Sequence, residues 1–191
     1  MKMSPWSSIR KRNAGFTLIE VIVIVAILAI LAGILAPMIF SQIDDAKLAR
    51  AEADAKSISS ASFVFRKDIG RWPNWDNACS PNATLVVGTG NLPSGVDDEN
   101  LFVVTTKISI DDYFAKNTYN CFPVSNNVGW KGPYMAAVNT DPWGNAYVIN
   151  ADQFNIDGGA VWVYSAGPNS VMESEAGAMT PNGDDIAIRI K

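Results

Sequence analysis

A single carboxylate, Glu20, stands at the start of a long apolar run, and its position is the strongest sign of chemistry in this sequence. It closes the run Gly15-Phe16-Thr17-Leu18-Ile19-Glu20, in which a small residue is followed by an aromatic one. A charged side chain inside a membrane-spanning helix is unfavourable by about 2.5 to 3.5 kcal/mol on insertion scales, and such a residue is functional by default. Glu20 therefore predicts a partner that neutralises it, although a charge in the first turn could also be a plain interfacial residue.

The absence of histidine excludes several common sites. Ser/His/Asp and Cys/His arrangements in their usual forms need this residue, and it is the commonest zinc ligand. The run Tyr164-Ser165-Ala166-Gly167 resembles part of a nucleophile elbow, but Val163 stands where that motif needs glycine. Gly88-Thr89-Gly90 is too short for a dinucleotide-binding loop. We do not expect an enzyme.

The two cysteines, Cys79 and Cys121, lie far apart in the sequence, and neither belongs to a CxxC pair. This spacing argues against a metal knuckle or a thioredoxin-like motif. In an exported head the pair would form a disulfide, whereas in a cytosolic head two free buried thiols would be the better interpretation.

The elements that position Glu20 begin with a basic leader and an apolar segment. Residues 1–15 contain four basic and no acidic side chains, and residues 21–40 contain no charged side chain. Twenty residues at about 1.5 Å each cross a hydrocarbon core of about 30 Å, so we predict a transmembrane segment over about 16–40. The positive-inside rule keeps the leader cytoplasmic and sends the rest of the chain outward.

A cleaved secretory signal peptide is the main alternative for this segment. Its apolar region would have about 7 to 15 residues and would end at a small-residue cleavage site. Here the apolar run is longer and ends in Pro37-Met38-Ile39-Phe40. A membrane anchor that remains in the mature protein is therefore favoured.

The length of 191 residues allows one globular domain behind this anchor. The formal net charge is −4, but loss of the four leader cations leaves eleven basic against nineteen acidic residues, a net charge of −8. An acidic head argues against nucleic-acid partners and leaves cations as ligands.

An amphipathic helix is predicted to continue beyond the membrane. Pro37 should kink or loosen it, because proline removes one helical hydrogen bond, although proline is also tolerated in membrane helices. Gly70 and Pro73 supply the stop, so the helix is expected over 16–71. Its apolar stripe recurs at spacings of three and four. The stripe consists of Leu48, Ala51, Ala55, Ile58, Ser62 and Phe65.

The head, residues 72–191, reads as short strands separated by turns. Over 72–130 one or two strands or a short helix near 110–116 are expected. The overall prediction is an α+β fold in which a long N-terminal helix packs on a small C-terminal antiparallel sheet. The tryptophans of this region could form a sugar-stacking surface, but we favour a role in the core. The β-prone runs of that region are 84–87 and 101–106, and strands of the antiparallel sheet are expected at 146–150, 160–165 and 186–190.

The N-terminal residues resemble the type IV pilin and pseudopilin family, whose precursors carry a basic leader ending in Gly and then Phe-Thr-Leu-x-Glu. The resemblance implies that residues 1–15 are a cleaved leader, cut by a prepilin peptidase after Gly15, and that the new terminus at Phe16 is N-methylated. It also implies that Glu20 pairs with the terminal amine of a neighbouring subunit. Pro37 matches a proline of the family's helix, near which pilin helices tend to melt in filaments.

Three ordered segments of the head are similar to the major pseudopilin of type II secretion systems. They are Gly132-Pro133-Tyr134, Asp141-Pro142-Trp143-Gly144-Asn145 and Ser165-Ala166-Gly167-Pro168-Asn169. Taken alone, the second segment is only a tight turn, in which proline fixes φ and glycine permits a positive φ.

In that family the loop after the third segment binds calcium, which needs six to eight oxygen ligands. The resemblance implies side-chain ligands from Asn169, Asp184 and Asp185, and backbone ligands from Ala166 and Val171. Asn169 departs from the family pattern because it stands where the family has aspartate, and the loop is longer. Glu173 or Glu175 could compensate, and a solvated acidic loop is the alternative.

The function expected from the resemblance is structural: a subunit of a helical homo-oligomeric filament, most closely a type II secretion pseudopilin that helps to export folded proteins. A longer region over 78–127 leaves open a major pilin of a type IV pilus, and an anchored binding domain is the remaining alternative. The implied partners are the prepilin peptidase, the inner-membrane assembly platform and minor pseudopilins. The implied location is the inner membrane with the head in the periplasm, and then a periplasmic or extracellular filament.

Overall fold

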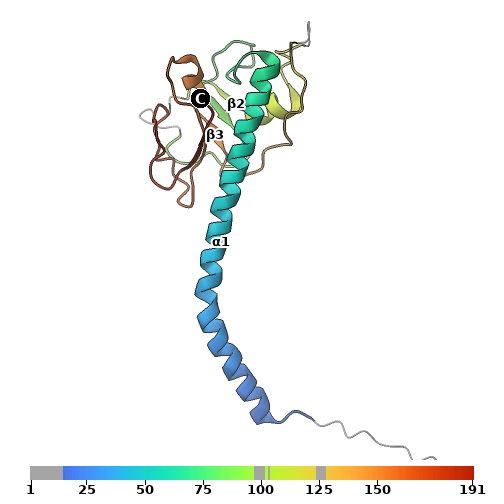
Figure 1. Ribbon diagram of the computed structural model, residues 1–191, viewed down its shortest axis with the longest axis vertical. Helices are drawn as coiled ribbons and strands as arrows, with labels where there is room; N and C mark the ends of the chain where they lie inside the picture. Colours follow the sequence, from blue (N-terminus) through green and yellow to red (C-terminus); the bar gives the residue numbers. More distant parts are fainter. Residues whose placement is uncertain (1–14, 97–101, 103, 124–127) are drawn as a thin grey trace, which may run out of the picture. The chain divides into compact units, whose positions relative to one another are not determined.

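A computed structural model describes residues 15–96, 102, 104–123 and 128–191. Its described residues divide into two compact units, one that ends at Asp44 and one that runs from Asp45 to Lys191. One long helix, α1 (Leu18–Ile69), begins in the first unit and ends in the second (Figure 1). Apart from Gly15, the predicted leader lies outside the described residues.

In the first unit, α1 is apolar and exposed. It contains a stretch long enough and apolar enough to cross a membrane, and none of that stretch is buried. Large side chains such as Ile30 and Ile34 are more than half exposed. The predicted transmembrane helix is therefore present. It starts at Leu18 rather than Phe16, and it continues through Pro37.

In the second unit, α1 buries the predicted stripe. Ala51, Ala55, Ile58 and Phe65 have no exposed surface. Leu48, the first member of the stripe, is still 39% exposed, so burial begins one turn later than the sequence pattern predicts. The helix stops at Ile69 because Gly70 takes a positive φ of 76° while its N–H still bonds to the carbonyl of Arg66.

Five strands form one mixed sheet, in the spatial order β2-β1-β3-β4-β5. Strands β1 and β2 run parallel, and the other three pairs are antiparallel. The α+β prediction is confirmed, with one parallel pair added to the expected antiparallel arrangement. The strands are β1 (Leu85–Val87), β2 (Lys107–Ser109), β3 (Val148–Ile149), β4 (Trp162–Ser165) and β5 (Ile186–Arg189).

The strand predicted over 101–106 is wrong where the structure describes it, because β2 starts only at Lys107. The hydroxyl of Thr84 accepts hydrogen bonds from the N–H groups of Thr105 and Thr106. These bonds to a side chain take the place of backbone bonds to a neighbouring strand. Residues 101 and 103 lie outside the described part of the chain. Two short helical turns complete the head: η1 (Asp112–Lys116), near the predicted helix, and η2 (Ala151–Asn155).

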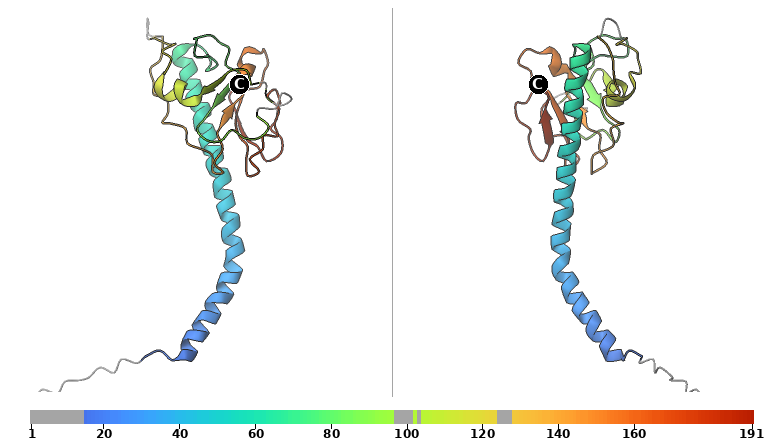
Figure 2. Two further views of the ribbon diagram at one scale, coloured as in Figure 1. Left: turned by 180° about the vertical axis from the view of Figure 1, so that it is seen from behind. Right: turned by 45° about the vertical axis from the view of Figure 1, so that its right-hand side comes forward.

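The sheet carries a hydrophobic core on each face. Helix α1 lies along one face, as both views of Figure 2 show, and its Ile58 and Phe65 pack in the same cluster as Val86, Ile149 and Val163. Loops cover the other face. The core there contains Leu85, Val96, Phe102, Val148, Tyr164, Ala166 and Met172.

The tryptophans contribute to these cores as expected. Trp72, Trp75 and Trp130 are partly buried against the helix-side cluster, and Trp162 packs against the other one. The ring of Trp72 stacks on Phe154 at a centroid distance of 4.8 Å.

Candidate functional site

The N-terminal motif folds as a capping box at the start of α1. The backbone N–H and the hydroxyl of Thr17 both donate hydrogen bonds to Oε2 of Glu20, at 2.8 and 2.9 Å. In return the N–H of Glu20 points to Oγ1 of Thr17 at 3.3 Å. This reciprocal pair satisfies N–H groups that a helix start would leave without partners, and it sets the first helical residue at Leu18.

Thr17 is a site residue that the sequence interpretation missed. The signal was available, because a threonine followed three residues later by a glutamate before an apolar run is a capping-box pattern. Gly15 and Phe16 precede the helix, and the Phe16 side chain is 81% exposed. The structure thus places the predicted cleavage point in an accessible segment just before the cap.

Glu20 is surrounded by apolar side chains rather than by cations. It shares a shallow surface depression of about 240 Å³ with Ile19, Val23 and Ile24. The ion pairs among the described residues do not include Glu20. Among the described residues, the Glu20 carboxylate is thus bound by the Thr17 donors and not by a cation.

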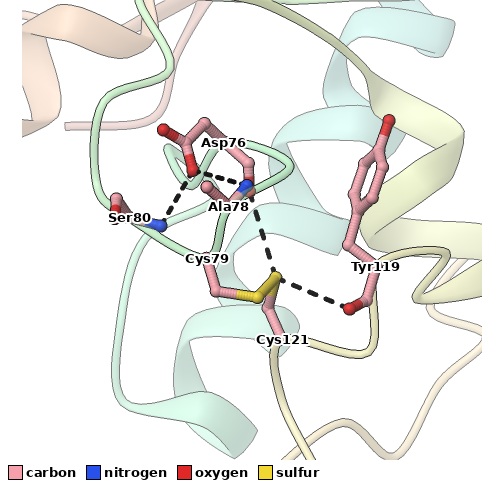
Figure 3. Close-up of a disulfide and its surroundings, with 6 residues drawn as sticks. All are labelled: Asp76, Ala78, Cys79, Ser80, Tyr119 and Cys121. Carbon is pink, nitrogen blue, oxygen red and sulfur yellow. Dashed lines mark hydrogen bonds between the residues drawn. A yellow bond between two sulfur atoms is a disulfide. The ribbon is translucent and has the colours of Figure 1, made fainter.

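A disulfide joins Cys79 and Cys121 in the head, as predicted for an exported protein (Figure 3). Cys79 lies in a turn built on Asp76, whose Oδ1 accepts hydrogen bonds from the N–H groups of Ala78 and Ser80, both at 2.9 Å. The disulfide ties the segment after α1 to the segment after η1.

The turn Asp141-Pro142-Trp143-Gly144-Asn145 depends on the buried carboxylate of Asp141. Its Oδ1 accepts hydrogen bonds from the N–H groups of Trp143 and Asn145, and Gly144 takes a φ of 93°. Its Oδ2 accepts a 2.7 Å hydrogen bond from the hydroxyl of Ser165. Two of the motif segments are thus joined by one side chain, which the sequence spacing did not reveal.

The Gly132-Pro133-Tyr134 segment anchors a loop next to η1. A Cβ at Gly132 would come within 2.6 Å of the Trp130 ring, so only glycine fits without a shift. The Trp130 indole donates to the carbonyl of Tyr113, and the N–H of Tyr134 donates to the carbonyl of Phe114. The segment has a packing role.

The predicted calcium loop is closed by hydrogen bonds between its two ends. Oδ2 of Asp184 accepts a 3.1 Å bond from the N–H of Asn169, whose own Oδ1 accepts a 2.7 Å bond from the N–H of Val171. A Cβ at Gly167 would collide with the carbonyl of Asp184, so glycine permits this approach. The structure therefore brings Asn169, Val171 and Asp184 together.

Asp185 holds the middle of the same loop. Its Oδ2 accepts hydrogen bonds from the N–H groups of Glu173 and Ser174, at 3.0 and 2.7 Å. Burial raises the pKa of Asp185, against the opposing effect of the hydrogen bonds from Ser174 and Glu173. Glu173 also joins the network, because its Oε2 accepts a 3.0 Å bond from the N–H of Asp184.

Two carboxylate oxygens of this loop, Oδ1 of Asp184 and Oδ1 of Asp185, are buried and have no hydrogen-bond partner. Buried carboxylate oxygens without partners are unfavourable, and a cation would satisfy them. Over the described ranges, however, no three acidic, histidine or cysteine side chains converge as a metal centre. Carboxylate, amide and backbone oxygens are the ligand types that calcium takes, and the loop contains all three, including those of Asn169 and Ala166.

Comparison with known families finds one match at the N-terminus. Residues 10–36 match the prokaryotic N-terminal methylation motif. The matched range includes Gly15, Phe16, the capping pair and most of the apolar helix.

Comparison with known proteins extends the likeness to the head. The chain is 29% identical over 138 residues to the type II secretion system core protein G of Pseudomonas aeruginosa, covering 72% of this chain and 73% of the relative. It is 26% identical to the core protein G of Aeromonas hydrophila over 178 residues, which are 93% of this chain and 92% of the relative. The Escherichia coli protein of the same name is 24% identical over 165 residues, 86% of this chain and 88% of the relative. No solved structure matches significantly.

Proposed function

We propose that this chain, which carries the N-methylation motif of type IV pilins and is homologous to the type II secretion core protein G, serves as the major structural subunit of a secretion pseudopilus. The observation that carries the proposal is the capping box at the head of an exposed apolar helix. The relatives over nearly the whole length are pseudopilins and not surface pilins, which favours secretion over adhesion or motility. The family is structural rather than catalytic.

Maturation would begin with cleavage between Gly15 and Phe16 by a prepilin peptidase. Gly15 is exposed, and a Cβ there would meet no atom of the described residues within 4 Å, so their packing does not require glycine at this position. The requirement would come from the peptidase. Cleavage releases the amine of Phe16, which is then methylated.

Mass spectrometry of the protein from membranes tests this step. We expect a mature chain that starts at N-methylated Phe16, and a Gly15→Leu variant that keeps its leader. Gly33→Ala is the matched control, because Gly33 also has open space around it but lies inside the helix. An unmodified chain that starts at Met1 would overturn the proposal.

Assembly would then use Glu20 as the counter-charge for a neighbouring subunit's N-terminus. Cleavage creates a cationic amine at the edge of the membrane, and a carboxylate on the next helix neutralises it through a charge-assisted hydrogen bond. Glu20 has no cationic partner within its own described chain, and its carboxylate is exposed. The neighbouring amine would replace the Thr17 donors.

The location proposed for the subunit is the inner membrane, with the head in the periplasm before it enters the filament. The basic leader favours a cytoplasmic N-terminus, and the Cys79–Cys121 disulfide suits an oxidising compartment. In this setting the partners are copies of the chain itself, the prepilin peptidase, the inner-membrane assembly platform and minor pseudopilins.

We also propose that the loop between Ala166 and Asp185 binds calcium. Asp184 and Asp185 would each use the carboxylate oxygen that has no partner, and Asn169, with the backbone of Ala166 and Val171, would add neutral oxygens. Glu173 lies within this network and would supply the charge that Asn169 lacks. Bound calcium would neutralise the buried charge and hold the ends of the loop together.

Thermal unfolding of the full chain in detergent tests the loop. At calcium concentrations well above the dissociation constant we expect a rise in Tm, because a ligand that binds only the folded state stabilises it. Asp184→Asn should abolish the rise, while Asp157→Asn, at an exposed position on another loop, should keep it. An unchanged Tm across millimolar calcium would count against the site.

A further inference from the structure

We propose that Cys79 is the sulfur through which the head exchanges disulfides with an external protein oxidant, and that Cys121 closes the bond in a second step. The disulfide itself does not distinguish its two sulfurs, but their surroundings do. Cys79 is exposed, whereas Cys121 is only partly accessible and packs against the helix-side core. The proposal rests on the proposed function only for placing the head in an oxidising compartment.

Cys79 is presented on a turn that needs no contribution from Cys121. The N–H of Cys79 donates to the carbonyl of Asp76, and the N–H of Asp76 donates to the carbonyl of Ser80. The Asp76 carboxylate adds the bonds to the N–H groups of Ala78 and Ser80. All these contacts lie within residues 76–80, so the turn can hold Cys79 at the surface before the disulfide exists. Its neighbours Asn77 and Ala78 are short and exposed, which leaves room for a large protein.

Cys121, by contrast, is anchored to the core by the next residue. The ring of Phe122 is buried and makes edge-to-face contacts with Phe65 and Trp75, at centroid distances of 5.3 and 5.6 Å. The carbonyl of Phe122 also accepts a 3.0 Å hydrogen bond from the N–H of Trp130. A sulfur held in this way can reach Cys79 but is poorly placed to meet the active site of another protein.

The contacts of the Cys121 sulfur favour the same order. Sγ of Cys121 lies 3.9 Å from the carbonyl oxygens of Asp76 and Tyr119 (Figure 3). In the reduced protein these oxygens would accept a hydrogen bond from the Cys121 thiol and hold its sulfur in place. Because thiol–disulfide exchange requires access to the attacking sulfur, the exposed Cys79 attacks first.

The exchange then runs in two balanced steps. The Cys79 thiolate attacks one sulfur of the oxidant's disulfide; that bond breaks, a mixed disulfide forms, and one oxidant thiolate leaves. The Cys121 thiolate next attacks Sγ of Cys79, which breaks the mixed disulfide and releases the second oxidant thiolate. Two cysteine thiols are oxidised, one oxidant disulfide is reduced to a dithiol, and the two thiol protons pass to the departing thiolates. The co-reactant is a protein with an exposed, reducible cysteine pair.

Single-cysteine variants of the full chain in detergent test the order. The probe is a purified thioredoxin-fold oxidase in its disulfide form, and the readout is the mixed disulfide on non-reducing gels. We expect Cys121→Ser, which keeps Cys79, to form this adduct at least tenfold faster than Cys79→Ser. The two should react equally in urea. Equal native rates, or a faster Cys79→Ser, would overturn the proposal.

A second pair of variants keeps both cysteines and therefore does not depend on the folding of a protein without the disulfide. Ala78→Trp places a bulky side chain beside Cys79, and Pro123→Trp does the same beside Cys121, at positions that are both exposed. After reduction, Ala78→Trp should slow re-oxidation by the same probe several-fold, and Pro123→Trp should not. The reverse result, or equal slowing, would contradict the proposal. These rates are read on purified protein, so a failure of filament assembly would leave them unchanged.

Discussion

The first 30 described residues and the head use the same kinds of apolar side chain in opposite ways. Between Gly15 and Asp44 almost every side chain is exposed, including Phe16, Ile34 and Phe40. In the head, Phe65, Tyr147 and Tyr164 are fully buried. The anchor thus leaves its apolar side chains free for contacts outside the described chain, whereas the head buries its own. Substitutions in the anchor should change assembly, and substitutions in the head should change folding.

Loss of the carboxylate at Glu20 should have the largest effect and should be confined to assembly. We expect Glu20→Gln to abolish filaments in a shearing or cross-linking assay, because the amine of the next subunit loses its counter-charge. The Tm of the head should stay within about 1 °C of the parent, since Glu20 has no tertiary contact. Glu52→Gln, on an exposed part of the same helix, is the control and should still assemble. A shifted Tm for Glu20→Gln would contradict the view that the anchor affects assembly and only the head affects folding.

Truncation of Phe65 should instead reduce the stability of the folded head. Its ring makes edge-to-face contacts with Tyr113, Phe114, Phe122 and Tyr134. Phe65→Ala should lower the free energy of unfolding by about 3 to 5 kcal/mol through lost burial and a residual cavity. The measurement is chemical denaturation of the full chain in detergent. Phe63→Ala, two residues earlier and 50% exposed, should cost less than about 1 kcal/mol.

Removal of the disulfide should give an intermediate loss within the head. The Cys79–Cys121 bond closes a sequence separation of 42 residues, and such loops typically contribute about 2 to 4 kcal/mol by restricting the unfolded chain. We expect the double Ala variant to lose this amount in denaturant titrations. Cleavage at Gly15 should proceed normally in that variant, and a loss of cleavage would show that the head influences the anchor.

The smallest expected effect is a pH-dependent change in Tm caused by Asp152. Burial raises the pKa of this carboxyl, so the ionised form is disfavoured in the folded state. Below the unfolded pKa of about 4 the carboxyl is protonated in both states and does not destabilise the fold. As pH rises through the folded pKa, the buried group ionises and the free energy of unfolding falls. Asp152→Asn should therefore raise Tm at pH 7, by less than about 3 °C, and should change it little at pH 3. A lower Tm at pH 7 would contradict the assignment.

The anchor was predictable because its signals are local. The apolar run and Glu20 lie within a few turns of one helix, and even the missed Thr17 follows a four-residue pattern. The helix stop at Gly70 was predictable for the same reason, since a positive φ after an apolar stripe favours glycine.

The head was less predictable because its decisive contacts cross long stretches of sequence. The parallel pairing of β1 with β2 requires a crossover whose course no local pattern indicates. The Thr84 hydroxyl moves the start of β2 to Lys107, and the Asp141 carboxylate reaches Ser165, 24 residues away. Each of these bonds depends on a fold already formed, so spacing alone could not reveal it.

The capping box at the head of α1 has a consequence for timing. A carboxylate without hydrogen-bond partners in lipid would be strongly unfavourable until it met a cation. The Thr17 donors, however, already bind Oε2 of Glu20. In the proposed assembly, a subunit in the bilayer would therefore keep its carboxylate hydrogen-bonded before it meets a neighbour. Its entry into the filament would exchange the Thr17 donors for the neighbouring amine, so insertion and polymerisation would be separate steps.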